Sequence, residues 1–219
     1  SGTSVTVFPV EEDSFHAPSE ITVPGDISSA AYFLVAGTII AGSRLRLNNV
    51  GINPTRTGIL DVLRDMGAHI SVHNERESGG ERVADLLVEA APLHGVSFGA
   101  EIMPRLIDEI PVLAVAALFA EGDTIITGAS ELRVKETDRL HAIATEVRKL
   151  SPGSVDERED GLVIHGKSEI RRAQVKSYDD HRMVMSLAVL GAAGEGVLIE
   201  NPESVNISYP TFFSEIERL

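Results

Sequence analysis

The sequence predicts an α/β (α+β) fold made of three copies of one unit. Each copy begins at an aspartate, runs into a helix rich in alanine and leucine, passes a glycine turn into a β run and then enters a second helix. The aligned aspartates are Asp26, Asp108 and Asp180, and 28 residues after each lie the predicted second-helix starts Pro54, Glu136 and Ser208. The glycines Gly42, Gly122 and Gly196 follow the aspartates by 16, 14 and 16 residues. This common spacing indicates internal repetition.

Each full unit is predicted to run strand, helix, strand, helix, strand, strand. Asn53-Pro54 and Ser208 have the chemistry of helix N-termini, and Gly67 closes the second helix of the first copy. The predicted strands are residues 44–50, 68–72, 84–89, 124–127, 162–165 and 197–200. The polar stretches predicted to be solvent-exposed turns are residues 73–82 and 151–160.

The repeats are predicted to cover residues 21–92, 96–168 and 173–219. Residues 1–20 are predicted to be an inter-lobe segment or the tail of a preceding lobe. The third copy stops after its second helix, without the two closing strands of the other copies. Residues 4–8, followed by a loop at residues 9–20, are one candidate for the missing pairing. We favour the alternative, in which this segment is the tail of a preceding lobe and something outside this chain completes the third copy.

The composition bounds the class of protein. A chain of 219 residues with 43% hydrophobic content can bury a core of its own. The sequence has no cysteine, which excludes disulfides and thiolate sites and suits a reducing compartment, so we expect a cytoplasmic protein. No stretch reaches the ~20 apolar residues of a membrane span, and residues 1–10 lack the regions of a signal peptide. The net charge of −14 argues against nucleic acid as a partner, so a local basic cluster must hold any anionic ligand.

The densest group of charged residues lies where the second helix of copy two begins. Its members are Arg133, Lys135, Glu136, Asp138 and Arg139. Lys135 and Arg139 lie four residues apart, and like charges on one helix face cost roughly 0.3 kcal/mol unless an anion lies between them. A helix N-terminus also attracts anions. The alternative is a solvated face with the ion pairs Glu136–Arg139 and Lys135–Asp138, and spacing alone leaves both interpretations open.

A second polar cluster opens the first helix of copy three. Its members are Asp179, Asp180, His181 and Arg182, and Asp108 with Glu109 stands at the equivalent place in copy two. Repetition therefore makes the two places neighbours. The alternative treats Asp179 and Asp108 as N-caps worth about 1 kcal/mol each, and His181 as a structural histidine. Capping alone leaves Arg182 unexplained.

Two other kinds of site find no support in the sequence. The seven histidines show no paired ligand spacing, so no metal site is expected. The glycine-containing turns at residues 23–26 and 51–56 match no nucleotide-binding pattern. We interpret both as turns that lead the chain into helices, and Arg56 is not assigned to a site.

Six strings carry a resemblance to a known family. They are PGDISSAAYFL, GINPTRTGILDVLRDMGA, PRLIDEIP, ELRVKETDRL, SYDDHRM and SYPTFF. Together they resemble the 5-enolpyruvylshikimate-3-phosphate synthase (EPSP synthase) family over residues 21–219. The combination of RVKETDRL and DDHRM is specific, because the UDP-N-acetylglucosamine enolpyruvyl transferases share the fold but not these strings.

The resemblance implies an enolpyruvyl transferase-like fold of two lobes, each with three βαβαββ repeats around a pseudo-threefold axis. This chain corresponds to the C-terminal lobe with an incomplete third repeat, which the extreme N-terminus of the family's proteins crosses back to complete. The missing N-terminal lobe is therefore an expected partner. It supplies many substrate contacts in this family, so the resemblance implies negligible turnover by this chain alone.

The family reaction transfers the carboxyvinyl group of phosphoenolpyruvate to the 5-hydroxyl of shikimate 3-phosphate, a step of aromatic amino acid biosynthesis. It releases phosphate through a tetrahedral intermediate and uses no metal or organic cofactor. Motif matching makes Asp108 the base that takes the 5-hydroxyl proton and Glu136 the candidate for proton transfer at the methylene carbon. Positioned proton transfers contribute roughly 10²–10⁴-fold each.

The same matching implies the substrate-binding residues. Arg139 and Arg182 match the guanidinium groups that hold the phosphoenolpyruvate carboxylate, a bidentate task for which lysine is a poor substitute. Lys135 matches a shikimate contact, and His181 joins the predicted substrate-binding set. Glu131 also joins it, at a position where some members carry a shikimate-contacting asparagine.

One position departs from the family pattern. Some members place a phosphoenolpyruvate-binding lysine three residues before the proline of the SYP string, and Ile207 stands there in this sequence. The enzyme family is the target of the inhibitor glyphosate. The loss of this lysine resembles a bacterial subclass that tolerates the inhibitor, so glyphosate sensitivity stays open.

Three rival interpretations remain. A non-catalytic anion-binding repeat domain predicts that Asp108 and Glu136 serve only stability. A relative of the UDP-N-acetylglucosamine enolpyruvyl transferases predicts no saturable response to shikimate phosphate. An activity like that of the RNA-terminal cyclases would need a nucleotide site, and the charge of −14 disfavours RNA.

Overall fold

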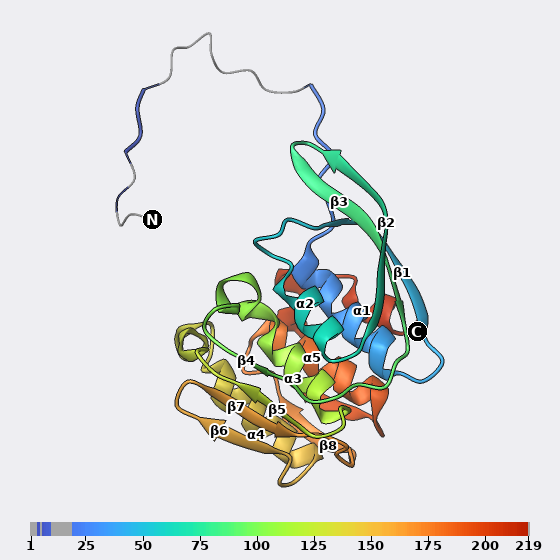
Figure 1. The fold of residues 1–219 in the computed structure, drawn as a ribbon. Coiled ribbons are helices and arrows are strands. Elements are labelled where there is room, and N and C mark those ends of the chain that lie inside the picture. Colours follow the sequence, from blue (N-terminus) through green and yellow to red (C-terminus); the bar gives the residue numbers. More distant parts are fainter. Residues whose placement is uncertain (1–3, 5, 10–18, 219) are drawn as a thin grey trace.

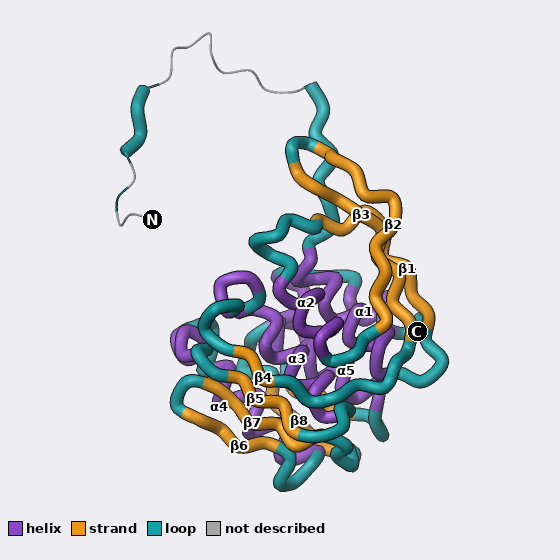
Figure 2. The backbone as a smooth tube through the Cα atoms, viewed as in Figure 1, coloured by secondary structure: helices purple, strands orange, loops and turns teal. Residues whose placement is uncertain are grey.

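A computed structural model of the chain describes residue 4, residues 6–9 and residues 19–218. Three helices, α1 (Ile27–Ile39), α3 (Ile110–Leu118) and α5 (His181–Ala193), pack against one another at the centre. The strands lie outside these helices (Figure 1, Figure 2). The three central helices are the first helices of the three predicted copies.

The composition of the central helices explains their place. All nine residues of α3, IPVLAVAAL, are buried, and eleven residues of α1 are buried as well. A helix that is apolar on every side gains stability only when every side is covered. The two neighbouring helices, together with α4 and β7, provide that cover for α3.

The second helices are α2 (Gly58–Asp65), α4 (Arg139–Leu150) and α6 (Phe212–Ile216). They begin three or four residues after the predicted starts at Pro54, Glu136 and Ser208, so that prediction was wrong in detail. Ahead of α2 the cause is local hydrogen bonding, because the Asn53 side chain accepts from Thr55 N at 3.0 Å and holds a turn before the helix. The repetition itself is confirmed, since the helices begin 32, 31 and 32 residues after the aligned aspartates.

The strands form three sheets, one for each copy. The first has the order β1 (Arg44–Gly51), β3 (Glu81–Glu89), β2 (His69–Ser78) and is antiparallel. The second has the order β4 (Ser97–Phe98), β5 (Asp123–Ile126), β7 (Gly161–His165), β6 (Val155–Arg158), with β4 parallel to β5. The third pairs β8 (Ala173–Lys176) with β9 (Val197–Glu200) in parallel.

The predicted order of elements is complete in the second copy, which runs β4, α3, β5, α4, β6, β7. In the first copy the opening strand is reduced to a parallel bridge between Gly25 and Val50. In the described part of the third copy, β8, α5, β9 and α6 are present and no closing strands follow. The predicted α/β fold of three related units is thus confirmed, and among the described residues the closing strands are found only in the first two units.

Short 3₁₀ turns precede several helices and complete the described elements. They are η2 (Met103–Arg105), η3 (Ile107–Glu109), η4 (Ser130–Val134) and η5 (Pro202–Ile207). Of these turns, η3 carries Asp108 directly before the central helix α3, and η4 carries Glu131 shortly before α4.

Both stretches predicted as exposed turns contain strand residues, which corrects the prediction. β2 continues to Ser78 and β3 begins at Glu81, so the turn is only Gly79-Gly80, and both glycines have positive φ. β6 lies within residues 151–160 and pairs with β7. Polar side chains misled the prediction because one face of each hairpin is solvated while the backbone is paired.

The division of residues 1–20 from the rest stays a prediction, because most of that segment lies outside the described residues. Its described residues, at positions 4, 6–9 and 19–20, belong to no strand. Among the helices that the structure describes, none is long and apolar enough to cross a membrane.

The β2–β3 hairpin is tied to β1 by one carboxylate. Asp85 accepts hydrogen bonds from Asn74 Nδ2 at 2.9 Å, Arg46 Nη2 at 2.8 Å and Asn49 N at 2.9 Å. The bond from Asn74, together with those from Arg46 and Asn49, holds the pKa of Asp85 well below its usual range. Asn49 itself has a positive φ at an irregularity in the β1–β3 register, so Asp85 also fixes the bulge.

We predict that Asp85→Asn weakens the acid dependence of stability. A carboxylate with a depressed folded-state pKa contributes stability above its unfolded pKa of about 3.9, and the contribution is lost as pH falls through the folded pKa. The urea midpoint of the variant should be lower at pH 7 and should change less between pH 5 and pH 2 than that of the unsubstituted chain. Asp65→Asn, at an exposed position, is the control. Parallel acid profiles for the Asp85 variant and the unsubstituted chain would contradict the prediction.

Candidate active site

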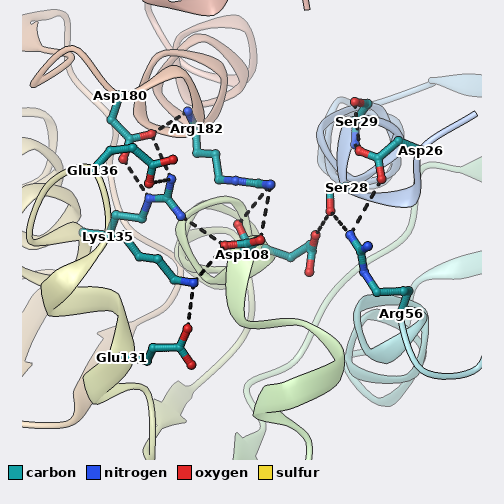
Figure 3. A network of polar contacts seen from close by, with 12 residues as sticks. Asp26, Ser28, Ser29, Arg56, Asp108, Glu131, Lys135, Glu136, Asp180 and Arg182 are labelled. Carbon is teal, nitrogen blue, oxygen red and sulfur yellow. Dashed lines mark hydrogen bonds and ion pairs between the residues drawn. The ribbon is translucent and has the colours of Figure 1, made fainter. Parts of the chain in front are cut away.

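A network of polar side chains lies where the N-terminal ends of α1, α3 and α5 meet (Figure 3). The helix ends contribute Asp26, Ser28, Ser29, Asp108, Asp180 and Arg182. The segments before α2 and α4 contribute Arg56, Glu131, Lys135 and Glu136. Residues far apart in the sequence thus meet at one place because the copies are arranged alike.

Arg139, the first residue of α4, is the centre of this network. Its side chain is only 1% exposed. Nε donates to Asp180 Oδ2 at 2.7 Å, Nη1 to Asp108 Oδ1 at 3.1 Å and Nη2 to Glu136 Oε2 at 2.6 Å. One guanidinium therefore brings both predicted catalytic acids, Asp108 and Glu136, to the same place.

Asp180 is fully buried and has two partners. It caps α5 by accepting from Arg182 N at 2.8 Å, and it holds Arg139. The alternative that Asp179 is the cap is wrong. Asp179 has the left-handed φ of 55°, whereas Asp180 has the extended φ and ψ that an N-cap requires.

Asp108 lies in η3 and caps no helix, because α3 begins at Ile110 without a side-chain cap. The N-cap alternative for Asp108 is therefore also wrong. Its carboxylate is 31% exposed and faces three cationic groups. Besides Arg139, these are Arg182 Nη2 at 3.4 Å and Lys135 Nζ at 3.9 Å. Asp108 is thus an accessible carboxylate among cations, suited to exchange a proton beside an anionic ligand.

Lys135 does not share a helix face with Arg139, which corrects the sequence interpretation. The backbone of Lys135 is extended, and the residue lies between η4 and α4. Its Nζ donates to Glu131 Oε1 at 2.7 Å. The predicted pair Lys135–Asp138 is absent from the described contacts, since Asp138 accepts from Arg133 Nη1 at 2.8 Å. The predicted pair Glu136–Arg139 is present.

His181 and Glu131 lie at the edges of the network. His181 is the first residue of α5 and is partly buried. This burial lowers the pKa of His181 below its usual range, so its ring is neutral at pH 7. Glu131 is mostly exposed, and its described contact is the ion pair with Lys135.

A second part of the network consists of residues that the sequence analysis assigns to no site. Ser28 donates to the buried carboxyl of Glu109, and Arg56 Nη2 donates to Ser28 Oγ at 3.0 Å. Arg56 also lies 3.7 Å from the Asp26 carboxylate. Burial raises the pKa of Glu109. The repeat pattern could have predicted a place for Arg56 in the network. Arg56 precedes α2 as Lys135 precedes α4, and each lies beside the aspartate of its own copy.

The site combines carboxylates with cationic side chains. In the part of the chain that the structure describes, no group of three or more His, Asp or Glu residues is placed to hold a metal ion. Lys135 and Arg182 are partly exposed and lie beside carboxylates, an arrangement that binds carboxylate or phosphate groups.

Comparison with known proteins identifies the family of the chain. The family model of EPSP synthase (3-phosphoshikimate 1-carboxyvinyltransferase) matches residues 1–216. The chain belongs to the EPSP synthase family. The 3-phosphoshikimate 1-carboxyvinyltransferase of Synechocystis sp. is 53% identical over 98% of this chain and 49% of its own length. That of Thermoanaerobacter sp. (strain X514) is 47% identical over 100% of this chain and 51% of its own. The chain thus spans about half the length of the curated relatives it matches.

Solved structures place the chain in the same family of folds. An EPSP synthase from Acinetobacter baumannii matches with a TM-score of 0.85 and 42% identity, over 90% of this chain and 46% of its own. The enolpyruvyl transferase NikO from Streptomyces tendae matches with a TM-score of 0.70 and 20% identity, over 91% of this chain and 44% of its own. The second match shows the fold alone.

We predict that Arg139→Met destabilises the chain far more than Lys135→Met. Removing Arg139 leaves the carboxylate of Asp180 buried without its cationic partner, at a cost of about 3–5 kcal/mol. Lys135 pairs with the mostly exposed Glu131, so its loss should cost less than about 1 kcal/mol. Urea unfolding of both variants measures the difference. Equal unfolding free energies would show that the network is not held by Arg139.

Proposed function

We propose that this chain forms one lobe of an enzyme that transfers the carboxyvinyl group of phosphoenolpyruvate to the 5-hydroxyl of shikimate 3-phosphate. One observation carries the proposal: Arg139 holds Asp108 and Glu136 together, with the cations Lys135 and Arg182 beside Asp108. The reaction needs two positioned acid–base groups and cations for two anionic substrates. The names of the relatives agree with this activity.

The proposed reaction uses the two carboxylates in turn. Asp108 takes the proton of the 5-hydroxyl of shikimate 3-phosphate while the hydroxyl oxygen attacks C2 of phosphoenolpyruvate. Glu136 delivers a proton to the methylene carbon C3. The product is a tetrahedral intermediate that carries a methyl group. Phosphate then leaves from C2 with the proton that Asp108 holds, and Glu136 takes a proton back from the methyl group. This restores the double bond and returns both carboxyl groups to their starting states.

The contacts of Arg139 suggest how the phosphoenolpyruvate carboxylate binds. All three guanidinium nitrogens already donate to carboxylates, and of these acceptors Glu136 is the most exposed, at 51%. The substrate carboxylate therefore takes the place of Glu136 on Nη2. This exchange releases Glu136 for proton transfer. Arg182, on another side of Asp108, contributes a second guanidinium.

Three further residues have lesser roles in the proposal. Lys135 contacts the shikimate ring substituents from its place beside Asp108. His181, neutral at pH 7, offers a ring nitrogen at the start of α5. Glu131 acts through Lys135, which it holds at 2.7 Å. No cofactor is part of the proposed reaction, and a cytoplasmic location stays a prediction.

The proposed partner is the missing N-terminal lobe. The third sheet contains only β8 and β9 among the described strands, whereas the second contains four. A hollow of about 530 Å³ lies beside it, lined mainly by apolar side chains of α5, β9 and α6 such as Ala188, Val197 and Phe213. An uncovered apolar surface of this kind supports completion of the third unit by residues from the other lobe.

The test is phosphate release from phosphoenolpyruvate and shikimate 3-phosphate. This chain is assayed alone and together with the separately expressed N-terminal half of the Synechocystis relative. We expect turnover only in the mixture, because each lobe holds part of the site. Glu136→Gln should lower that turnover by roughly 10²–10⁴-fold. Glu159→Gln, at an exposed position outside the network, should leave turnover unchanged.

Other outcomes would reject parts of the proposal. Turnover by the chain alone would show that the other lobe is not required. Equal turnover in Glu136→Gln and Glu159→Gln would remove Glu136 from the chemistry. No phosphate release in any mixture, with both halves folded, would favour a non-catalytic anion-binding domain.

A further inference from the structure

The segment that leads into α5 has an unfavourable backbone. Tyr178 and Asp179 both lie in the left-handed region, with φ of 57° and 55°. Residues with a Cβ rarely adopt this conformation, and two in succession persist only where the surroundings hold them. They directly precede Asp180, the buried carboxylate that holds Arg139. The strained residues therefore lie next to Asp180, which positions the guanidinium of Arg139 at the centre of the network.

A buried carboxylate on α4 holds this segment. Glu146 is fully buried and accepts from Tyr178 Oη at 2.7 Å, Lys176 N at 2.9 Å and Lys149 Nζ at 2.6 Å. A carboxylate out of water needs such partners, and two of the three come from the strained segment and the strand before it. Burial and the bond to Glu146 raise the pKa of Tyr178 to about 12, so the phenol keeps the proton that it donates.

Glu146 and Arg139 lie on the same face of α4. They are seven residues apart, which is about two helical turns, and the side chain of each is no more than 1% exposed. Both reach the segment of residues 176–180. Arg139 holds its last residue, Asp180, and Glu146 holds Tyr178 and the backbone of Lys176.

We propose that Glu146 and Tyr178 are positioning residues that, with Arg139 and Asp180, clamp the start of α5 onto α4. The α4 clamp, made of these four residues, fixes Asp180 and through it the guanidinium of Arg139. Arg139 in turn sets how Asp108 and Glu136 lie, as described above. The clamp acts on the geometry of the site, and its effect on turnover rests on the function proposed above.

The test compares two tyrosines in the 219-residue chain. Tyr178→Phe removes the bond to Glu146, and Tyr209→Phe removes an equivalent bond, from Tyr209 Oη to Glu215 Oε2 at 2.6 Å, outside the clamp. Hydrogen exchange of the Arg139 Nε–H, followed by ¹⁵N NMR, reports how firmly Asp180 holds it. We expect exchange to be roughly tenfold faster in Tyr178→Phe and unchanged in Tyr209→Phe.

Turnover in the mixture with the N-terminal half gives the second readout. Tyr178→Phe should lower kcat per folded molecule roughly tenfold, and Tyr209→Phe should not. Urea unfolding gives the folded fraction, and Glu146→Gln, which keeps the shape but not the charge, should change exchange in the same direction. Equal Arg139 exchange in the two tyrosine variants would overturn the clamp. If the mixture with the unsubstituted chain were inactive, the proposed function would be wrong. The hydrogen-exchange measurement would still show whether the α4 clamp exists.

Discussion

The buried ion pair between Arg139 and Asp180 is the contact on which the site depends. Two charges taken out of water are tolerated only when nearly every donor and acceptor finds a partner. Arg139 meets this condition with three carboxylates and Asp180 with the helix start that it caps. The same condition that makes the pair stable also fixes Asp108 and Glu136 relative to each other. Stability and the arrangement of the two proposed catalytic groups thus share one cause.

Repetition supplies the rest of the geometry. Three apolar helices pack side by side, and their N-terminal ends carry positive partial charge toward one region. In a chain with a net charge of −14, this region brings the basic side chains of Lys135, Arg139 and Arg182 together beside those helix ends. The anion binding proposed for this site would therefore depend on the local arrangement and not on the overall charge.

Much of this was predictable from the sequence, because the aligned aspartates and the apolar helices repeat in register. The residues assigned by family motifs do gather at one place. The sequence could not reveal the starts of the second helices, since turn hydrogen bonds such as Asn53 to Thr55 compete with the helix. It also concealed Glu146, because a glutamate on a helix is usually a surface residue, and its partner Tyr178 is 32 residues away. Contacts of that range have no local signature.

The shared face of Arg139 and Glu146 also limits how the gene for this protein can change. One residue added to or removed from α4 between Arg139 and Glu146 would rotate one of these side chains relative to the other about the helix axis by roughly 100°. A loss or gain of a single codon there would separate the two contacts, even if every side chain in the site were retained. The tip of the β2–β3 hairpin, at the exposed turn Gly79-Gly80, has no comparable constraint. Length variation within the family should therefore accumulate at such tips and spare the interior of α4.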